Sequence, residues 1–239
     1  MTLQEKHRGV LLNYMEKIGI IGGLGPQSTE LFYHEFIKLC QTRKEVEYPN
    51  MLINSMNPWE LVHLLKDKKS TFNLVKSEIA KIQGNVDFIA SPCNTIHFII
   101  DEIREFSKVP VLAIHEEVVK EISKSKIKKV GILGTKTTVY SNFYQNELEK
   151  KNINFEILSE QEEDKLNSLI FDKMLHGKDH DEMHKLLVKH IQLLKNKGCD
   201  GIILACTELP LFIKQEDVDV KLFASTNILA QSVFERAFK

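Results

Sequence analysis

Short apolar runs rich in isoleucine and valine alternate with longer amphipathic segments along the chain. The apolar runs predict β-strands over residues 17–22, 50–55, 86–91, 109–114, 128–134, 154–159, 200–205 and 220–225. The amphipathic segments predict helices over residues 27–42, 58–66, 70–83, 95–106, 115–124, 137–151, 161–176, 180–198 and 226–238. Continuously apolar strands separated by helices are typical of a parallel sheet covered on both faces. The pattern therefore predicts an α/β fold with right-handed crossovers.

The chain contains a long internal repeat. Residues 17–22 (KIGIIG) match residues 129–134 (KVGILG), and the segment around Cys93 matches the segment around Cys206, at offsets of 112 and 113 residues. A repeat of this length is far longer than the unit of a short-period solenoid. It predicts two copies of one α/β lobe, with parallel sheets, related by a pseudo-two-fold axis.

The repeat also suggests where the two lobes begin and end. We expect an N-terminal lobe built from residues 1–115 plus 225–239, and a C-terminal lobe built from residues 116–224. The length of 239 residues agrees with one large domain or two modest ones.

Composition restricts the class of protein. Hydrophobic residues make up 43% of the chain and charged residues 27%, which argues against disorder. The formal net charge of -1 offers no basic excess to attract nucleic acid or an anionic membrane surface. No apolar stretch approaches the roughly 20 residues needed to span a bilayer. We expect a cytoplasmic protein with no nucleic-acid or membrane partner, and a homodimer only because two-fold pairs are common.

Two of the four cysteines, Cys93 and Cys206, occupy matching positions just after a central strand of each repeat. Open parallel sheets bind ligands at this end of their strands, so lobes that face each other would bring both thiols to one cleft. Each thiol precedes a helix start, which is expected to lower its pKa. Thr95 and Thr207 beside them can bind the carboxylate of a small ligand.

A thiolate on one side of a carbon atom and a thiol on the other form a general base that faces a general acid. Such a pair can remove a proton from one face of a stereocentre and return one to the other face. The paired cysteines therefore suggest racemisation or epimerisation next to a carboxylate.

Other interpretations of the cysteines are less informative. A cysteine after a strand is often only a small buried hydrophobe, and Cys40 and Cys199, which lack a partner at the repeat offset, are interpreted in this way. His97 follows Cys93 by four residues, but one cysteine and one histidine make only half of a zinc site. No metal site is expected.

The glycine-rich segment IGGLGP (21–26) has two interpretations. Ser28 stands where a dinucleotide-binding pattern has its third glycine, and Pro26 interrupts the turn, so a nicotinamide cofactor is not expected. The segment is either a plain strand-to-helix turn or a place where backbone N–H groups approach a ligand. Glu208 is interpreted as an acid near a helix start without a catalytic role. Residues 160–165 are interpreted as a solvated helix face.

At these residues the sequence resembles the aspartate/glutamate racemase family, the cofactor-independent amino-acid racemases. The segments that carry the resemblance are IGGLGPQST (21–29), SPCNTIH (91–97), VGILGTKTTVYSNFY (130–144), EEDKLNSLIFDKMLHG (162–177) and LACTELPLF (204–212). They cover nearly the whole chain from about Met15. The resemblance implies two flavodoxin-like lobes with the active site between them, an amino acid as substrate, and no cofactor.

The resemblance also implies roles for individual residues. Cys93 and Cys206 are expected to be the acid–base pair, and Lys165 matches the family lysine that meets the substrate's side-chain carboxylate. Residues expected to hold the α-carboxylate or the amino group are Asn94, Thr95, Thr135 and Thr207. Leu24 is expected in the substrate-binding glycine loop, at a position where the family often has methionine.

The expected substrate is an acidic amino acid, with aspartate first. However, the loop SMNPWELV (55–62) lacks the arginine with which dedicated aspartate racemases grip a side-chain carboxylate. A broad-specificity or glutamate racemase is therefore the alternative, followed by a related hydantoin racemase or maleate isomerase. A protein that binds amino acids without turnover is the non-enzymatic alternative.

Overall fold

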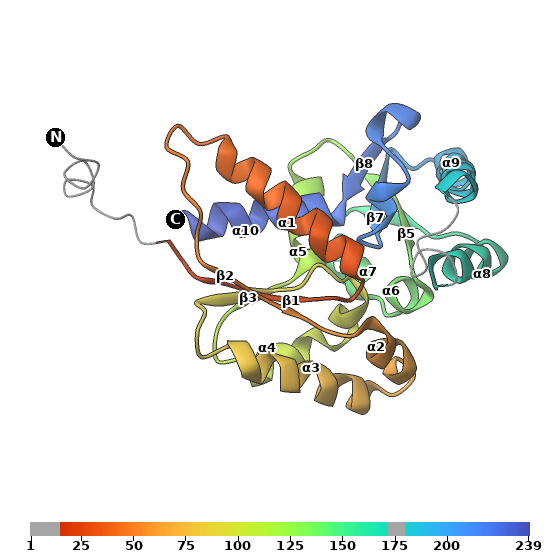
Figure 1. Ribbon diagram of the computed structural model, residues 1–239. Coiled ribbons are helices and arrows are strands. Elements are labelled where there is room, and N and C mark those ends of the chain that lie inside the picture. Colours follow the sequence, from red (N-terminus) through yellow and green to blue (C-terminus); the bar gives the residue numbers. More distant parts are fainter. Residues whose placement is uncertain (1–14, 172–179) are drawn as a thin grey trace.

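The computed structural model describes residues 15–171 and 180–239. Residues 1–14 of the predicted N-terminal lobe and the end of the helix predicted over 161–176 lie outside the described residues. The described chain forms two four-stranded parallel sheets with the orders β2-β1-β3-β4 and β6-β5-β7-β8 (Figure 1). The two orders are the same once each strand is matched to its counterpart in the repeat. The α/β fold with two parallel sheets is therefore confirmed.

The predicted strands are all present, and each is shorter than expected, most of all the strand predicted over 109–114. The first sheet contains β1 (Ile18–Gly22), β2 (Met51–Ser55), β3 (Phe88–Ala90) and β4 (Val111–Leu112). The second sheet contains β5 (Lys129–Gly134), β6 (Asn154–Glu156), β7 (Gly201–Ala205) and β8 (Lys221–Ala224). The central strands β1, β3 and β7 are buried along their whole length, which explains why their sequences are continuously apolar.

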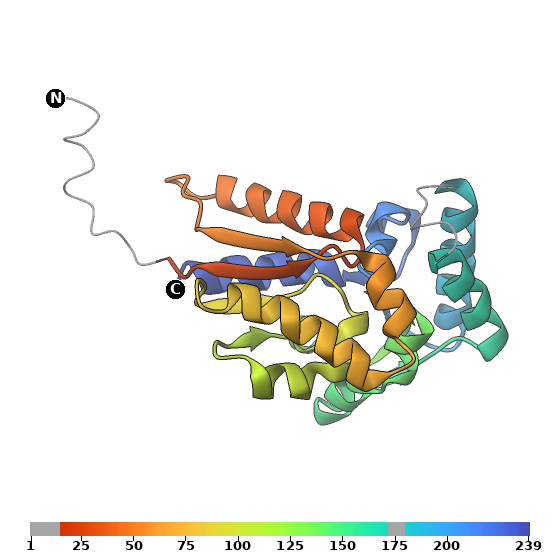
Figure 2. The same cartoon turned by 60° about the horizontal axis from the view of Figure 1, so that its bottom comes forward.

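Helices cover both faces of both sheets (Figures 1 and 2). The first half contains α1 (Pro26–Gln41), α2 (Pro58–Leu64), α3 (Lys68–Ile82), the 3₁₀ turn η1 (Thr95–Ile99), α4 (Ile100–Phe106) and α5 (Ile114–Ser123). The second half contains α6 (Lys136–Tyr140), α7 (Phe143–Lys150), α8 (Glu160–Leu169), α9 (His180–Asn196), the 3₁₀ turns η3 (Leu209–Leu211) and η4 (Gln215–Asp217), and α10 (Ser225–Ala237). No helix in either described stretch has the length and apolar character that crossing a lipid bilayer requires.

One helix predicted as continuous is divided. The segment predicted over 137–151 forms α6 and α7, because Asn142 adopts a left-handed backbone conformation with φ 60° and so interrupts the helix. The segment predicted over 95–106 begins as the 3₁₀ turn η1 before it becomes α4.

The core consists of four clusters, one on each face of each sheet. Alternate residues of a central strand enter opposite clusters: Ile202 packs with α8 and α9, whereas Ile203 packs with α5 and α7. The helix α5 joins the two lobes, since Ile114 belongs to a cluster of the first sheet and Val118 to one of the second. The C-terminal helix α10 lies against α1, with Leu229 in the same cluster.

Candidate active site

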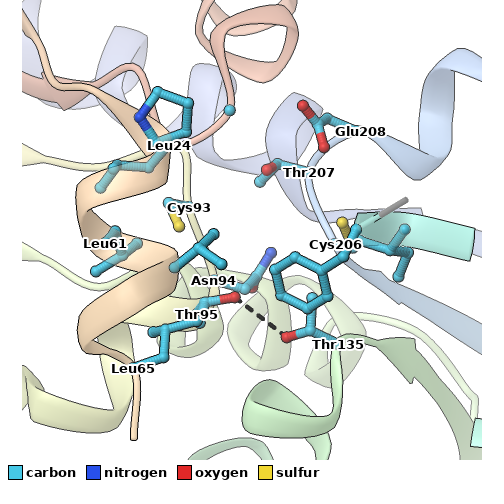
Figure 3. Close-up of a pocket in the computed structure, with 15 residues that line it drawn as sticks. Leu24, Leu61, Leu65, Cys93, Asn94, Thr95, Thr135, Cys206, Thr207 and Glu208 are labelled. Atoms are coloured by element: carbon cyan, nitrogen blue, oxygen red, sulfur yellow. Dashed lines mark hydrogen bonds between the residues drawn. The ribbon is translucent and has the colours of Figure 1, made fainter. Parts of the chain in front are cut away.

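A pocket of about 530 Å³, part of it open to solvent, lies at the carboxyl ends of the strands of both sheets. The loops after β1, β3, β5 and β7 line it, together with α2 and the C-terminal end of α8 (Figure 3). Seven of the eight predicted site residues line this pocket: Leu24, Cys93, Asn94, Thr95, Thr135, Cys206 and Thr207. Ligand binding at this end of the strands is what a parallel sheet favours.

Cys93 and Cys206 lie on opposite sides of the pocket (Figure 3). Cys93 follows β3 and Cys206 follows β7, the corresponding strands of the two sheets. Their exposed fractions are only 6% and 8%. The duplicated chain therefore presents one sulfur from each sheet to the same pocket.

The thiols are less acidic than the sequence suggests. Burial raises the pKa of Cys93 to about 11, which outweighs the backbone N–H groups of Ile96 and Thr95 that lower it. Burial also raises the pKa of Cys206 well above its usual range, and the neighbouring Glu208 raises it further. The expected helix-start donors are present, but desolvation of the thiolate is the larger effect.

His97 holds the backbone of the Cys93 loop. Its Nδ1 donates a hydrogen bond of 2.8 Å to the carbonyl oxygen of Cys93, and its Nε2 accepts one of 3.2 Å from the backbone N–H of Ile114. A carbonyl can only accept and an amide N–H can only donate, so the imidazole is neutral. Burial accordingly lowers the pKa of His97 to about 4. Both ring nitrogens are occupied, so neither can bind a metal beside Cys93.

The side chain of Asn94 connects the loop after β3 to α7 and α10 at the pocket. Its Oδ1 accepts a hydrogen bond of 2.7 Å from the Tyr144 hydroxyl, and its Nδ2 donates one of 2.9 Å to Oγ of Ser225. The hydroxyl of Ser225 in turn donates to the carbonyl of Leu204, at 2.7 Å. Each polar side-chain atom of Asn94 thus has one partner in the protein, and the second N–H of its amide remains for the substrate contact that the resemblance implies.

Three threonine hydroxyls meet where the lobes adjoin. Oγ1 of Thr95 lies 3.2 Å from Oγ1 of Thr135, which caps α6 and lies 3.0 Å from Oγ1 of Thr138 (Figure 3). On the other side of the pocket, the backbone carbonyl of Thr207 accepts a hydrogen bond of 2.8 Å from the hydroxyl of Thr226. The first contacts position the hydroxyls of Thr95 and Thr135 at the pocket, and the last one holds the backbone of Thr207.

Glu208 also lines the pocket, a position that its interpretation as an acid near a helix start does not include. It is 5% exposed, and its Oε1 is buried without a hydrogen-bond partner among the described residues. The carboxylate lies against the glycine loop, where a Cβ atom on Gly25 would come within 2.2 Å of Oε1. Burial raises the pKa of Glu208 to about 7. Its place directly after Cys206 and Thr207 was the available sequence signal.

The glycine loop therefore does more than turn the chain. Gly23 has a φ of +84°, which favours glycine, and Gly25 lets the loop approach the Glu208 carboxylate. The loop also brings Leu24 to the pocket.

Lys165 is the predicted site residue that the structure does not bring to the pocket. Its side chain is 48% exposed on α8, and Nζ pairs with Oε1 of Glu162 at 2.9 Å. Helical periodicity turns Glu163 and Leu166 inward, so Lys165 faces outward beside α9. The structure thus places Lys165 in solvent and not at the substrate position that the resemblance implies, and it buries Glu163, which the solvated-face interpretation of residues 160–165 places at the surface.

The remaining cysteines and histidines form no further centre. Cys40 and Cys199 are buried in separate core clusters, as a packing role requires. Within residues 15–171 and 180–239, no three His, Cys, Asp or Glu side chains are grouped so that they could hold a metal ion.

The fold and the pocket define a two-lobe α/β protein with a small-molecule site to which each lobe contributes one cysteine. The family model described as Asp/Glu/Hydantoin racemase matches residues 21–233. The chain belongs to this family, which confirms the resemblance and supports an isomerase activity.

Known proteins resemble the chain over most of its length. The broad specificity amino-acid racemase RacX of Bacillus subtilis is 31% identical over 220 residues, which cover 90% of this chain and 95% of RacX. The crystal structure of an aspartate racemase homologue from Pyrococcus horikoshii is 32% identical, with a TM-score of 0.79 over 94% of this chain and 100% of that one. A putative Asp/Glu racemase from Yersinia pestis is 25% identical, with a TM-score of 0.83 over the same shares.

Proposed function

We propose that the protein is an amino-acid racemase that works without pyridoxal phosphate and uses Cys93 and Cys206 as its two acid–base groups. The observation that carries this proposal is the position of the two sulfurs. They come from matching places in two like sheets and lie on opposite sides of one buried pocket. A bound Cα between them would present one face to each thiol.

In the proposed reaction, one cysteine enters as the thiolate and takes the α-proton from its face of the substrate. The bond electrons remain on Cα and are delocalised into the α-carboxylate. The opposite thiol then donates its proton to the other face, so that the configuration inverts and the two cysteines exchange protonation states. The reverse reaction uses the same pair in the opposite order.

The pocket supplies groups that suit these steps. Thr95, Thr135 and Thr207 line the pocket, and their hydroxyls would donate to the α-carboxylate, on which negative charge grows in the transition state. The raised thiol pKa makes each thiolate a strong base but a scarce one at neutral pH. A bound α-ammonium group would favour the thiolate through its positive charge.

For the substrate, we propose the broad-specificity alternative rather than aspartate, the first expectation. Among the described residues that line the pocket there is no arginine or lysine, and Lys165 lies elsewhere. A bidentate arginine is the usual selector for a second carboxylate. The similarity to a racemase named for broad specificity supports the same proposal.

Deuterium exchange tests the two-base mechanism. In deuterated buffer, without added pyridoxal phosphate or metal, the product enantiomer should carry solvent deuterium while the remaining substrate keeps its protium early in the reaction. Equal early labelling of both enantiomers would indicate one shared base and contradict the mechanism.

Substitution of the cysteines tests their assignment. Cys93→Ser and Cys206→Ser should each lower racemisation by orders of magnitude, whereas Cys40→Ser, in the core away from the pocket, should retain turnover if it folds. Normal racemisation by either pocket variant would overturn the assignment. Turnover of hydantoins or maleate alone, or binding without any optical change, would favour the other members of the family or a binding protein.

Three further predictions stay as proposals. We propose that the lobes divide at residues 115/116 and 224/225, that the protein is cytoplasmic and that it forms a homodimer.

A further inference from the structure

The wall of the pocket beside Cys93 is apolar. Leu61 and Leu65, from α2 and its C-terminal end, line this wall with Leu24 (Figure 3). Ile170 and Phe171, at the end of α8, add apolar surface to the same pocket. A substrate side chain that leaves Cα toward this wall would contact carbon atoms.

The charge that the described residues bring to the pocket has one sign. Among the described lining residues, Glu208 is the single Asp, Glu, Lys or Arg side chain. Its buried Oε1 has no partner in the described protein, although a buried polar atom normally has one. An ammonium group is the complement that this unpaired carboxylate group lacks at the pocket wall, whereas a second carboxylate would meet either this negative charge or the apolar wall.

We infer that the pocket prefers amino acids with a neutral, apolar side chain to aspartate and glutamate: Glu208 binds the α-ammonium group, and Leu61 and Leu65 contact the side chain. This inference rests on the proposed function and names its substrate class. Glu208, with a pKa raised to about 7 by burial, becomes fully ionised when the ammonium group binds. The threonine hydroxyls remain for the single carboxylate.

The ammonium contact also couples binding to the chemistry. The charge of Glu208 raises the pKa of both Cys93 and Cys206. An ammonium group that neutralises the Glu208 charge removes this increase in the thiol pKa. A substrate with an α-ammonium group therefore assists formation of the thiolate that takes its α-proton.

Substrate profiling tests the inference on the full chain. The rates of α-proton exchange and of racemisation should be measured for L-leucine, L-methionine, L-aspartate and L-glutamate under one set of conditions. We expect kcat/KM for the neutral substrates to exceed that for the acidic ones by at least about tenfold. A preference for aspartate or glutamate would overturn the inference and leave the racemase proposal standing.

A charged substitution on the wall should move this preference. Leu65 is half-buried, so Leu65→Arg can keep its guanidinium near solvent while it reaches the pocket. We expect the ratio of kcat/KM for aspartate to that for leucine to rise by about tenfold. Leu65→Met, which adds no charge, is the matched control and should leave the ratio unchanged. An unchanged ratio in a folded Leu65→Arg protein would contradict the position of the side chain.

A pair of ligands isolates the ammonium contact. L-leucine and 4-methylpentanoate differ in the ammonium group, so calorimetry should show leucine binding about tenfold more tightly to the protein. Glu208→Gln should close this gap, and Glu163→Gln, which changes a buried glutamate that does not line the pocket, should preserve it. A merely structural role for Glu208 would weaken both ligands equally, and that result would overturn the inference.

The same titrations separate the two proposals. If no amino acid is racemised, the proposed function fails, and the selectivity is then judged from the binding constants alone. Tighter binding of aspartate than of leucine would overturn the inference in that case as well.

Discussion

The hydroxyl of Tyr144 in α7 donates a hydrogen bond of 2.7 Å to Oδ1 of Asn94, the residue that follows Cys93. The helix α7, which belongs to the second half of the chain, thus fixes the loop after β3 that carries Cys93. Tyr144 is fully buried, and burial raises its pKa far above the usual range, so the phenol remains a donor.

Tyr144→Phe should destabilise the protein by about 1–3 kcal/mol, because it leaves a buried amide oxygen without its partner. The free energy of unfolding in urea measures this loss. Tyr140→Phe is the matched control: Tyr140 is 46% exposed, and its change should stay within about 0.5 kcal/mol. Equal stability of the two variants would show that the contact between the lobes contributes nothing.

Glu208→Gln should make the pocket thiols more acidic. The carboxylate raises the pKa of Cys93 and Cys206, so its removal should lower both values and speed alkylation by iodoacetamide at pH 8. The rate for each cysteine peptide can be followed by mass spectrometry as a function of pH. Glu163→Gln, in which the replaced carboxyl also has a pKa raised to about 7, should keep the wild-type profile because Glu163 lies outside the pocket. A Glu208→Gln profile identical to the wild type would contradict the prediction.

His115 should make the protein sensitive to acid. It packs between His97 and Phe143, its Nδ1 is buried without a partner among the described residues, and burial lowers its pKa to about 2. Below the ordinary value of about 6.5, the unfolded chain binds a proton that the folded chain refuses, so stability falls as pH decreases from that value. At pH 5 this effect amounts to about 2 kcal/mol.

His115→Phe should remove this part of the pH dependence, as unfolding in urea at pH 7 and pH 5 would show. The replacement of the exposed His34 by Phe should leave the difference between the two pH values as it is in the wild type. If His115→Phe loses as much stability between pH 7 and pH 5 as the wild type does, another group is responsible.

Gly25→Ala should disturb the site through Glu208. The new Cβ would stand 2.2 Å from Oε1, so the carboxylate or the glycine loop has to move. We expect KM for an amino acid to rise by about tenfold or more, with a smaller change in the free energy of unfolding. Gly84→Ala, at a position where a Cβ meets nothing within 4 Å, provides the control. If KM is unaltered in Gly25→Ala, substrate binding does not depend on the position of the Glu208 carboxylate.

The strands could be predicted from local pattern because the central ones are buried on both faces, and this burial leaves an unbroken apolar run such as residues 201–205. Helix ends were less predictable. The break at Asn142 depends on one residue that adopts a left-handed conformation, and the apolar periodicity of residues 137–151 does not indicate this conformation.

The chain order of residues was enough to establish the duplicated α/β lobe, the parallel sheets and the pairing of Cys93 with Cys206, because each follows from local periodicity or from a match between the two halves. Spatial folding decided which groups surround those features. It gave both amide atoms of Asn94 to protein partners, turned Lys165 outward and buried Glu208 against Gly25. Desolvation and hydrogen bonding depend on which distant segments surround a group, so neither can be predicted from the residues next to that group in the sequence.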